Sequence, residues 1–279
     1  MIKFRTLSKR MFLQKWQLAH FTLVLQLLAI IFCSIMIATR SNSDFISWIG
    51  IAQEGSIASS ISALLVQTTI LADMIFFALI YIKGLRMLLS QTWHLLPISS
   101  SKLYLANLLT NVLSCAYIFV IQIIGVLAGE FILSLVDKKY QFWQFLGENF
   151  QSFTSQSSAA IMDDLAPFIF LILIVLFLTS FVDFTNFSSR VVTDFLPLKN
   201  IKWVRWAINV ILVIIGMYLF MKLDTYFGRM YYSQASKLNY IAQNLRFVNI
   251  SNLELLFGTI IFGGIDIYLI NRYLETRIK

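Results

Sequence analysis

Two aspartates, Asp73 and Asp266, stand within long apolar runs of the sequence. A carboxylate at the centre of a bilayer costs about 2.5–3.5 kcal/mol on insertion scales, so such a side chain should face protein or water rather than lipid. Each shares a helical face with other small or polar residues: Ser59, Ser62 and Thr69 with the first, Thr259 and Gly263 with the second. Faces of this kind could line a path for a polar substrate across a membrane.

A third polar face follows the apolar run 103–136, where the polar and small residues recur at helical steps: Asn107, Asn111, Ser114, Gln122, Gly125 and Gly129. The functional interpretation is again a substrate path, and the alternative is helix packing, because small and amide residues form the usual contacts between membrane helices. The residues predicted to line a translocation path are Thr69, Asp73, Asn111, Ser114, Gln122 and Asp266.

Motifs for catalysis, metal binding or nucleotide binding are missing from the sequence. Its two histidines, His20 and His94, lack the H-E-x-x-H context of a metalloprotease, and no GxxxxGK[ST] loop is present to cradle ATP. Both cysteines, Cys33 and Cys115, fall inside apolar runs. We therefore expect no enzymatic activity, no cofactor and no metal on this chain. If ATP drives the protein, another chain must hold the nucleotide and its Mg²⁺.

The composition is that of a membrane protein: 58% of the 279 residues are hydrophobic and 13% are charged, with a mean hydropathy of +0.77. A soluble domain carries about 25% charged residues. In lipid a spanning segment must satisfy its own backbone, so apolar runs of about 20 residues predict helices. The fold class predicted is all-α, a single polytopic membrane domain over 1–279 with six spans at about 18–38, 59–82, 103–136, 165–183, 204–221 and 253–271.

The distribution of basic residues predicts the orientation. Most of the 22 Lys and Arg residues fall on the side that carries both termini, which the positive-inside rule places in the cytoplasm. The net charge of +8 is then explained by the anionic inner face of a cell membrane rather than by nucleic acid. All six tryptophans lie at or near span ends, where indole rings prefer the headgroup region.

Residues 1–16 place Phe4, Leu7, Met11 and Phe12 on one helical face with Lys and Arg around the rest. This pattern predicts an amphipathic helix lying in the inner membrane interface. The alternative is a solvated basic tail that only sets the orientation.

The stretch 91–104, "QTWHLLPISSSKLY", separates the second and third spans. Pro97 cannot donate a backbone hydrogen bond and clashes with the preceding turn, so a helix should stop before it. The hydroxyls of Ser99 to Ser101 can cap the amides that start the next helix. The sequence therefore predicts a short cytoplasmic helix, a break and a new helix start, and the alternative is an ordinary capped turn.

Six spans, an amphipathic N-terminal helix and the "LPISSSKLY" turn together resemble the permease subunit of an ABC-2 type ABC transporter. The resemblance implies that 86–99 contains a coupling helix docked on a separate ATPase chain. It also implies that two permease subunits, identical or different, work with two ATPase chains as an exporter. The coupling residues it implies are Trp93, His94, Leu95, Leu96, Pro97, Ile98 and Ser99. The long 137–164 segment departs from the tighter outer connection of many members.

The function expected from this resemblance is that of an ATP-driven exporter subunit in the cell membrane, with both termini cytoplasmic. The alternative is a non-transporting membrane protein, such as an immunity or scaffold factor, which would need no ATPase partner. An intramembrane enzyme is disfavoured by the lack of a catalytic constellation. A secondary transporter is disfavoured because the inverted repeat expected of that class is not visible.

Overall fold

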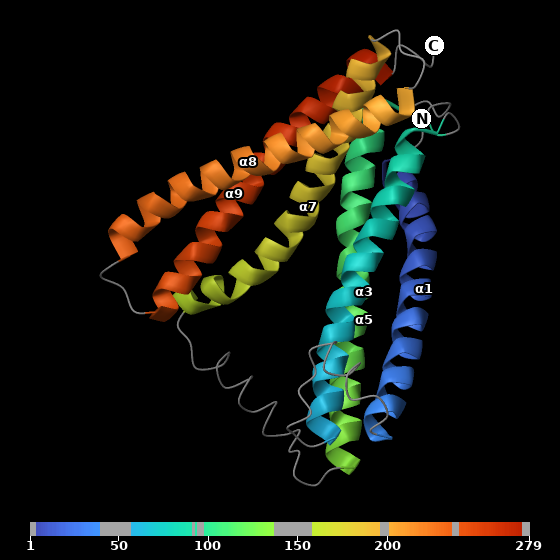
Figure 1. Ribbon diagram of the computed structural model, residues 1–279, viewed down its shortest axis with the longest axis vertical. Coiled ribbons are helices and arrows are strands. Elements are labelled where there is room, and N and C mark those ends of the chain that lie inside the picture. Colours follow the sequence, from blue (N-terminus) through green and yellow to red (C-terminus); the bar gives the residue numbers. More distant parts are fainter. Residues whose placement is uncertain are drawn as a thin grey trace. The chain divides into compact units, whose positions relative to one another are not determined.

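The computed structural model describes residues 4–39, 57–90, 93, 98–136, 158–195, 201–235 and 240–274. These residues form helices and contain no strand (Figure 1). The long helices are α1 (Phe4–Ala38), α3 (Ile57–Leu88), α5 (Ser100–Val136), α7 (Ser158–Asp194), α8 (Ile201–Ala235) and α9 (Tyr240–Leu269). A short π-helical segment, η1 (Ile270–Leu274), continues from α9. The all-α prediction is therefore confirmed.

Six helices are long and apolar enough to cross a membrane, as the sequence predicts. Each begins before its predicted start, and the 30 residues of α9 make a helix about 45 Å long. A hydrocarbon core is only about 30 Å thick. Hydropathy predicts the part of a helix that lies in lipid, but it does not predict the helical turns that continue outside the lipid.

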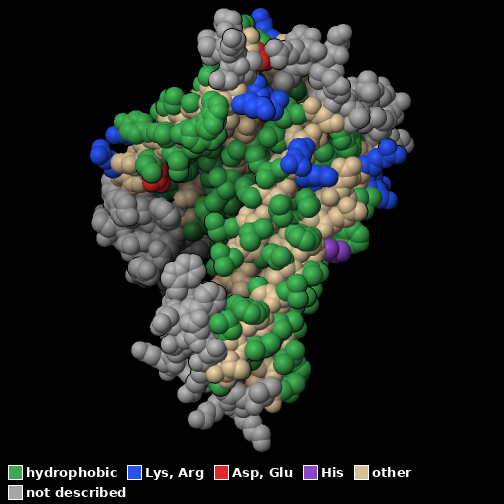
Figure 2. Space-filling view, turned by 45° about the vertical axis from the view of Figure 1, so that its right-hand side comes forward, with side chains coloured by type: hydrophobic (Ala, Val, Ile, Leu, Met, Phe, Trp, Pro, Cys, Tyr) green, Lys and Arg blue, Asp and Glu red, His purple; other side chains and the backbone are tan. Residues whose placement is uncertain are grey.

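The outer surface of these helices is strongly apolar, and hydrophobic side chains cover much of the face drawn in Figure 2. Phe21, Leu28, Ile124 and Met221 are 60%, 61%, 61% and 63% exposed. Contiguous apolar surface of this kind marks a membrane or protein contact. With helices of spanning length, it identifies a multi-pass membrane protein.

The predicted interfacial helix over 1–16 is not found. Helix α1 runs without a break from Phe4 to Ala38, so no turn separates an interfacial segment from the first span. Leu7 and Met11, expected to face lipid headgroups, are 1% and 0% exposed, and Lys15 of the expected polar face is 0% exposed. Protein therefore covers Leu7 and Met11 of the predicted apolar face, while Phe4 of that face is exposed.

The chain divides into two compact units. Unit 1 contains Met1–Leu7, Leu85–Val112 and Gln156–Lys279, which include the first turns of α5 together with α7, α8, α9 and η1. Unit 2 contains Ser8–Gly84 and Leu113–Ser155, and so most of α1 and α3 with the second part of α5. The single membrane domain over 1–279 stays a prediction.

In unit 1, α7 packs against both α8 and α9. Leu173, Phe177 and Leu255 form the buried core, with Phe220 and Phe262 against it. Gly258 lets α9 approach closely, since a Cβ there would lie 2.6 Å from Cε2 of Phe177. In unit 2, the described parts of α1, α3 and α5 run side by side (Figure 1) around a core of Ala19, Phe76, Ile80 and Ile118.

Candidate functional site

Helices α3 and α5 are separate, and the break predicted at Pro97 falls between them, outside the described residues. Helix α3 ends at Leu88, and the amide of Trp93 donates to the carbonyl of Ser90 at 3.2 Å. A new helix begins at Ser100, where the Ser99 carbonyl accepts from the amides of Lys102 and Leu103 at 3.0 and 3.2 Å. The described coupling residues are thus Trp93, Ile98 and Ser99, while His94, Leu95, Leu96 and Pro97 lie outside the described residues. Their role in coupling stays a prediction.

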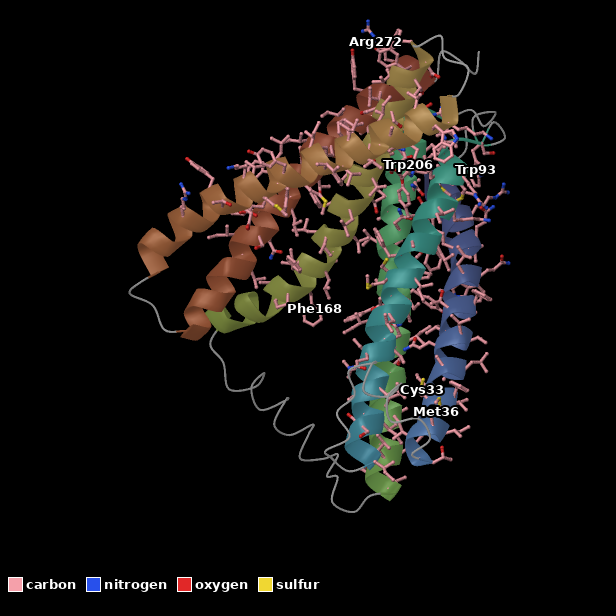
Figure 3. The ribbon with its side chains drawn as sticks, viewed as in Figure 1. Cys33, Met36, Trp93, Phe168, Trp206 and Arg272 are labelled. Atoms are coloured by element: carbon pink, nitrogen blue, oxygen red, sulfur yellow. The ribbon has the colours of Figure 1, made fainter. Side chains whose placement is uncertain are left out.

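Side chains at one end of unit 1 come from three segments that are distant in sequence. Figure 3 shows Trp93, Trp206 and Arg272 toward this end, with Phe168 of α7 toward the other. The segment between α3 and α5, the start of α8 and the end of α9 therefore share one end of this unit.

Ser101, expected to help cap α5, hydrogen bonds to another helical segment. Its hydroxyl lies 3.1 Å from Oδ1 of Asn271, to which it donates. The same hydroxyl accepts from Nδ2 of Asn271 at 2.9 Å. This pair joins the first turn of α5 to η1, directly after the predicted coupling segment.

Tyr104 makes a second connection one turn further along α5. Its hydroxyl donates to Oδ2 of Asp266 on α9 at 2.7 Å, and both residues are 0% exposed. Protein therefore covers the side chain of Asp266. The start of α5 is held to α9 and η1 by two hydrogen-bonded pairs, Tyr104–Asp266 and Ser101–Asn271.

Helix α7 contributes to the same buried cluster. Ser180 is 0% exposed and its side chain hydrogen bonds to Tyr104. Asp183, 1% exposed, acts electrostatically on both Tyr104 and Asp266. Gly263 of α9 borders the group, since a Cβ there would lie 3.8 Å from the Ser180 hydroxyl and 3.9 Å from the Tyr104 hydroxyl. We call Tyr104, Ser180, Asp183 and Asp266 the tyrosine–aspartate cluster; it joins α5, α7 and α9 within unit 1.

A separate polar network crosses the three helices of unit 2. Nε2 of Gln26 on α1 donates to the Thr69 hydroxyl on α3 at 3.1 Å, and Nε2 of Gln122 on α5 donates to Oε1 of Gln26 at 3.1 Å. Gln122 also hydrogen bonds to the carboxylate of Asp73. Three residues predicted to line a path, Thr69, Asp73 and Gln122, therefore belong to one connected group. We call Gln26, Thr69, Asp73 and Gln122 the glutamine network.

The other predicted path residues have different positions. Asp266 belongs to the tyrosine–aspartate cluster of unit 1. Asn111 and Ser114 lie along α5 between Tyr104 and Gln122, and each is 1% exposed. The structure thus buries Asn111, Ser114, Gln122 and Asp266, while Thr69 and Asp73 are half-buried. Whether these residues line a path stays a prediction.

Four members of the two groups were not singled out by sequence: Gln26, Tyr104, Ser180 and Asp183. Gln26 is an isolated amide within the apolar first span, which is itself a signal for an interhelical contact. Asp183 is an acid at the predicted end of the fourth span, where it resembles an ordinary solvated residue. Tyr104 resembles an interfacial aromatic residue, and no sequence pattern indicates that its hydroxyl hydrogen bonds to Asp266.

The described residues offer no group of three or more His, Cys, Asp or Glu side chains that could hold a metal ion. The sequence matches no known family model, and neither a curated protein nor a solved structure is found to be similar to it.

Proposed function

We propose that this protein is the membrane-spanning permease subunit of an ATP-driven ABC-2 type exporter. A separate ATPase chain binds Mg²⁺ and ATP and docks on segment 86–99. Two permease subunits, identical or different, form the transport unit in the cell membrane, with both termini in the cytoplasm.

Six helices of spanning length support the proposal, together with the break between α3 and α5. The orientation rests on the positive-inside rule. It is also supported by the shared end of unit 1 at which Trp93, Trp206 and Arg272 lie (Figure 3), because Trp93 and Arg272 belong to segments predicted to be cytoplasmic and Trp206 lies at the predicted cytoplasmic end of its span.

The observation that carries the proposal is the connection of α5 to α9. Ser101 and Tyr104 follow the predicted coupling segment directly, and they hydrogen bond to Asn271 and Asp266. A force applied to segment 86–99 by ATPase closure would move the first turns of α5. The two pairs would then transmit the displacement to α9 and η1. Ser180 and Asp183 interact with Tyr104, so the displacement would also reach α7. The helix that follows the coupling segment is thus joined to α9, η1 and α7 within unit 1.

Purification from the native host in mild detergent tests the proposal. We expect a second chain that contains a GxxxxGK[ST] loop to co-purify with this protein, and the complex to hydrolyse ATP. Recovery of the protein without any ATPase, under conditions that preserve other membrane complexes, would instead favour the non-transporting alternative.

A further inference from the structure

The glutamine network ends on buried acceptor atoms. The Gln122 side chain donates to Gln26 and hydrogen bonds to Asp73. Oε1 of Gln122 and Oδ1 of Asp73 are buried atoms that have no hydrogen-bond partner among the described residues. Gln122 itself is only 3% exposed. A buried acceptor without a donor costs about 1–3 kcal/mol, so this end of the network is complementary to a group that donates hydrogen bonds.

A positively charged donor matches this end better than a neutral one, because one of the two oxygens belongs to a carboxylate and charge-assisted hydrogen bonds are about twice as strong as neutral ones. Among the described residues, Cys115 of α5 and Lys15 of α1 are ionisable groups of this region. Asp73 and Lys15 both act electrostatically on the Cys115 thiol, whereas the hydrogen bond to Asp73 comes from Gln122.

An ammonium group fits two acceptors better than a hard metal cation does. Ca²⁺ and Mg²⁺ require about six or more oxygen ligands, and the described residues contain no group of three or more His, Cys, Asp or Glu side chains that could hold a metal ion. An ammonium carries three N–H donors, which can point to a few separate oxygens.

The depth of the network indicates what the ammonium must be attached to. Asp73 lies at the midpoint of α3 (Ile57–Leu88), and a spanning helix places its midpoint in the hydrocarbon core, far from the headgroups of lipids. Beside it on α3, Ile70, Leu71 and Met74 are 57%, 55% and 67% exposed. A molecule that reaches Asp73 must therefore carry an apolar body to match this surface.

We infer that the Asp73–Gln122 end of the glutamine network binds the ammonium group of an amphiphilic amine. The inference deepens the proposed function, on which its role in transport rests, because it names the class of molecule that the site would accept. Binding itself requires no ATPase, so it is measured on the purified chain alone.

The test is equilibrium binding of radiolabelled dodecylammonium to the full-length protein in lipid nanodiscs, with the signal of empty nanodiscs subtracted. We expect saturable binding at one site per chain. Unlabelled dodecylammonium should compete, dodecanol should not, and dodecyltrimethylammonium should compete at least about tenfold more weakly because it has no N–H donors. This series needs no variant and is independent of any folding defect.

Variants then locate the site. Asp73→Asn and Gln122→Met should each weaken binding about tenfold or more, since each removes one acceptor oxygen. Glu130→Gln is the matched control: it neutralises a buried acid of α5 that hydrogen bonds to Ser62, two helical turns beyond Gln122, and should bind as the native protein does.

Absence of saturable binding, equal competition by dodecanol, or unchanged binding by Asp73→Asn would overturn the inference. If binding fails but an ATPase co-purifies, the proposed function stands and only the ligand class is wrong. If binding succeeds but no ATPase is found, the amine site stands without the export function.

Discussion

The hydroxyl of Tyr104 lies 2.7 Å from Oδ2 of Asp266, and neither side chain is exposed. This contact joins the second turn of α5 to α9 at 162 residues' separation in sequence. It lies one turn beyond the Ser101–Asn271 pair, so the helix that follows the proposed coupling segment is joined to α9 and to η1 at two successive positions. A segment attached in this way can pass a displacement to α9 instead of bending alone.

Replacing Tyr104 with Phe should destabilise unit 1. The variant keeps the ring but removes the donor to Asp266, which leaves a buried carboxylate without the hydrogen bond observed here. The expected loss is about 1–3 kcal/mol, measured as a lower midpoint of thermal unfolding in detergent. Tyr218→Phe is the control because Tyr218 of α8 is 59% exposed; an equal shift in both variants would contradict the account of this contact.

Replacing Gly258 with Val should separate α9 from α7. The Gly258 Cβ position lies 2.6 Å from Cε2 and 2.8 Å from Cδ2 of Phe177, so a branched side chain forces that ring out of the core. Overpacking of this kind costs about 1–3 kcal/mol. Gly264→Val on the same helix serves as the control, since nothing lies within 4 Å of its Cβ position. Thermal unfolding should separate the two variants, and a Gly264 variant that is the less stable would show the packing to be wrong.

Replacing Gln26 with Leu should weaken unit 2. The change removes the acceptor of Gln122 and the donor to Thr69. Interhelical hydrogen bonds in membrane proteins are worth about 0.6 kcal/mol on average and up to about 1.7, so we expect a moderate decrease in unfolding temperature. Gln17→Leu, at an exposed position of the same helix, should have little effect. No difference between the two would argue against the glutamine network.

The sequence was sufficient to predict the helices, since continuous apolar runs leave a chain in lipid no alternative that satisfies its backbone. Their ends were predicted less well. Pro97 and Ser99 carry local signals, and the helix start at Ser100 agrees with them. The first 16 residues were misinterpreted because an amphipathic face has the same pattern whether lipid or protein covers it. Leu7 and Met11 are covered by protein.

The polar groups were predicted as individual residues and not as clusters. Asp73, Gln122 and Asp266 stand out against their apolar surroundings, so their polarity alone identified them. Their partners depend on the rotation and register of neighbouring helices, which a single sequence does not encode in any short pattern. Gln26 and Gln122 form a hydrogen bond although they are 96 residues apart in the sequence. Tyr104 and Asp266 form one although they are 162 residues apart.

The central claim is that an ATPase chain docks on segment 86–99. The most direct measurement is whether that ATPase co-purifies with a double variant, Leu95→Asp with Leu96→Asp. Ile278→Asp in the C-terminal segment is the matched control, because it adds a charge on the same predicted side of the membrane. The account predicts that the double variant inserts normally but loses the ATPase, while the control retains it. Retention of the ATPase, with unchanged ATP-dependent activity, by the double variant would contradict it.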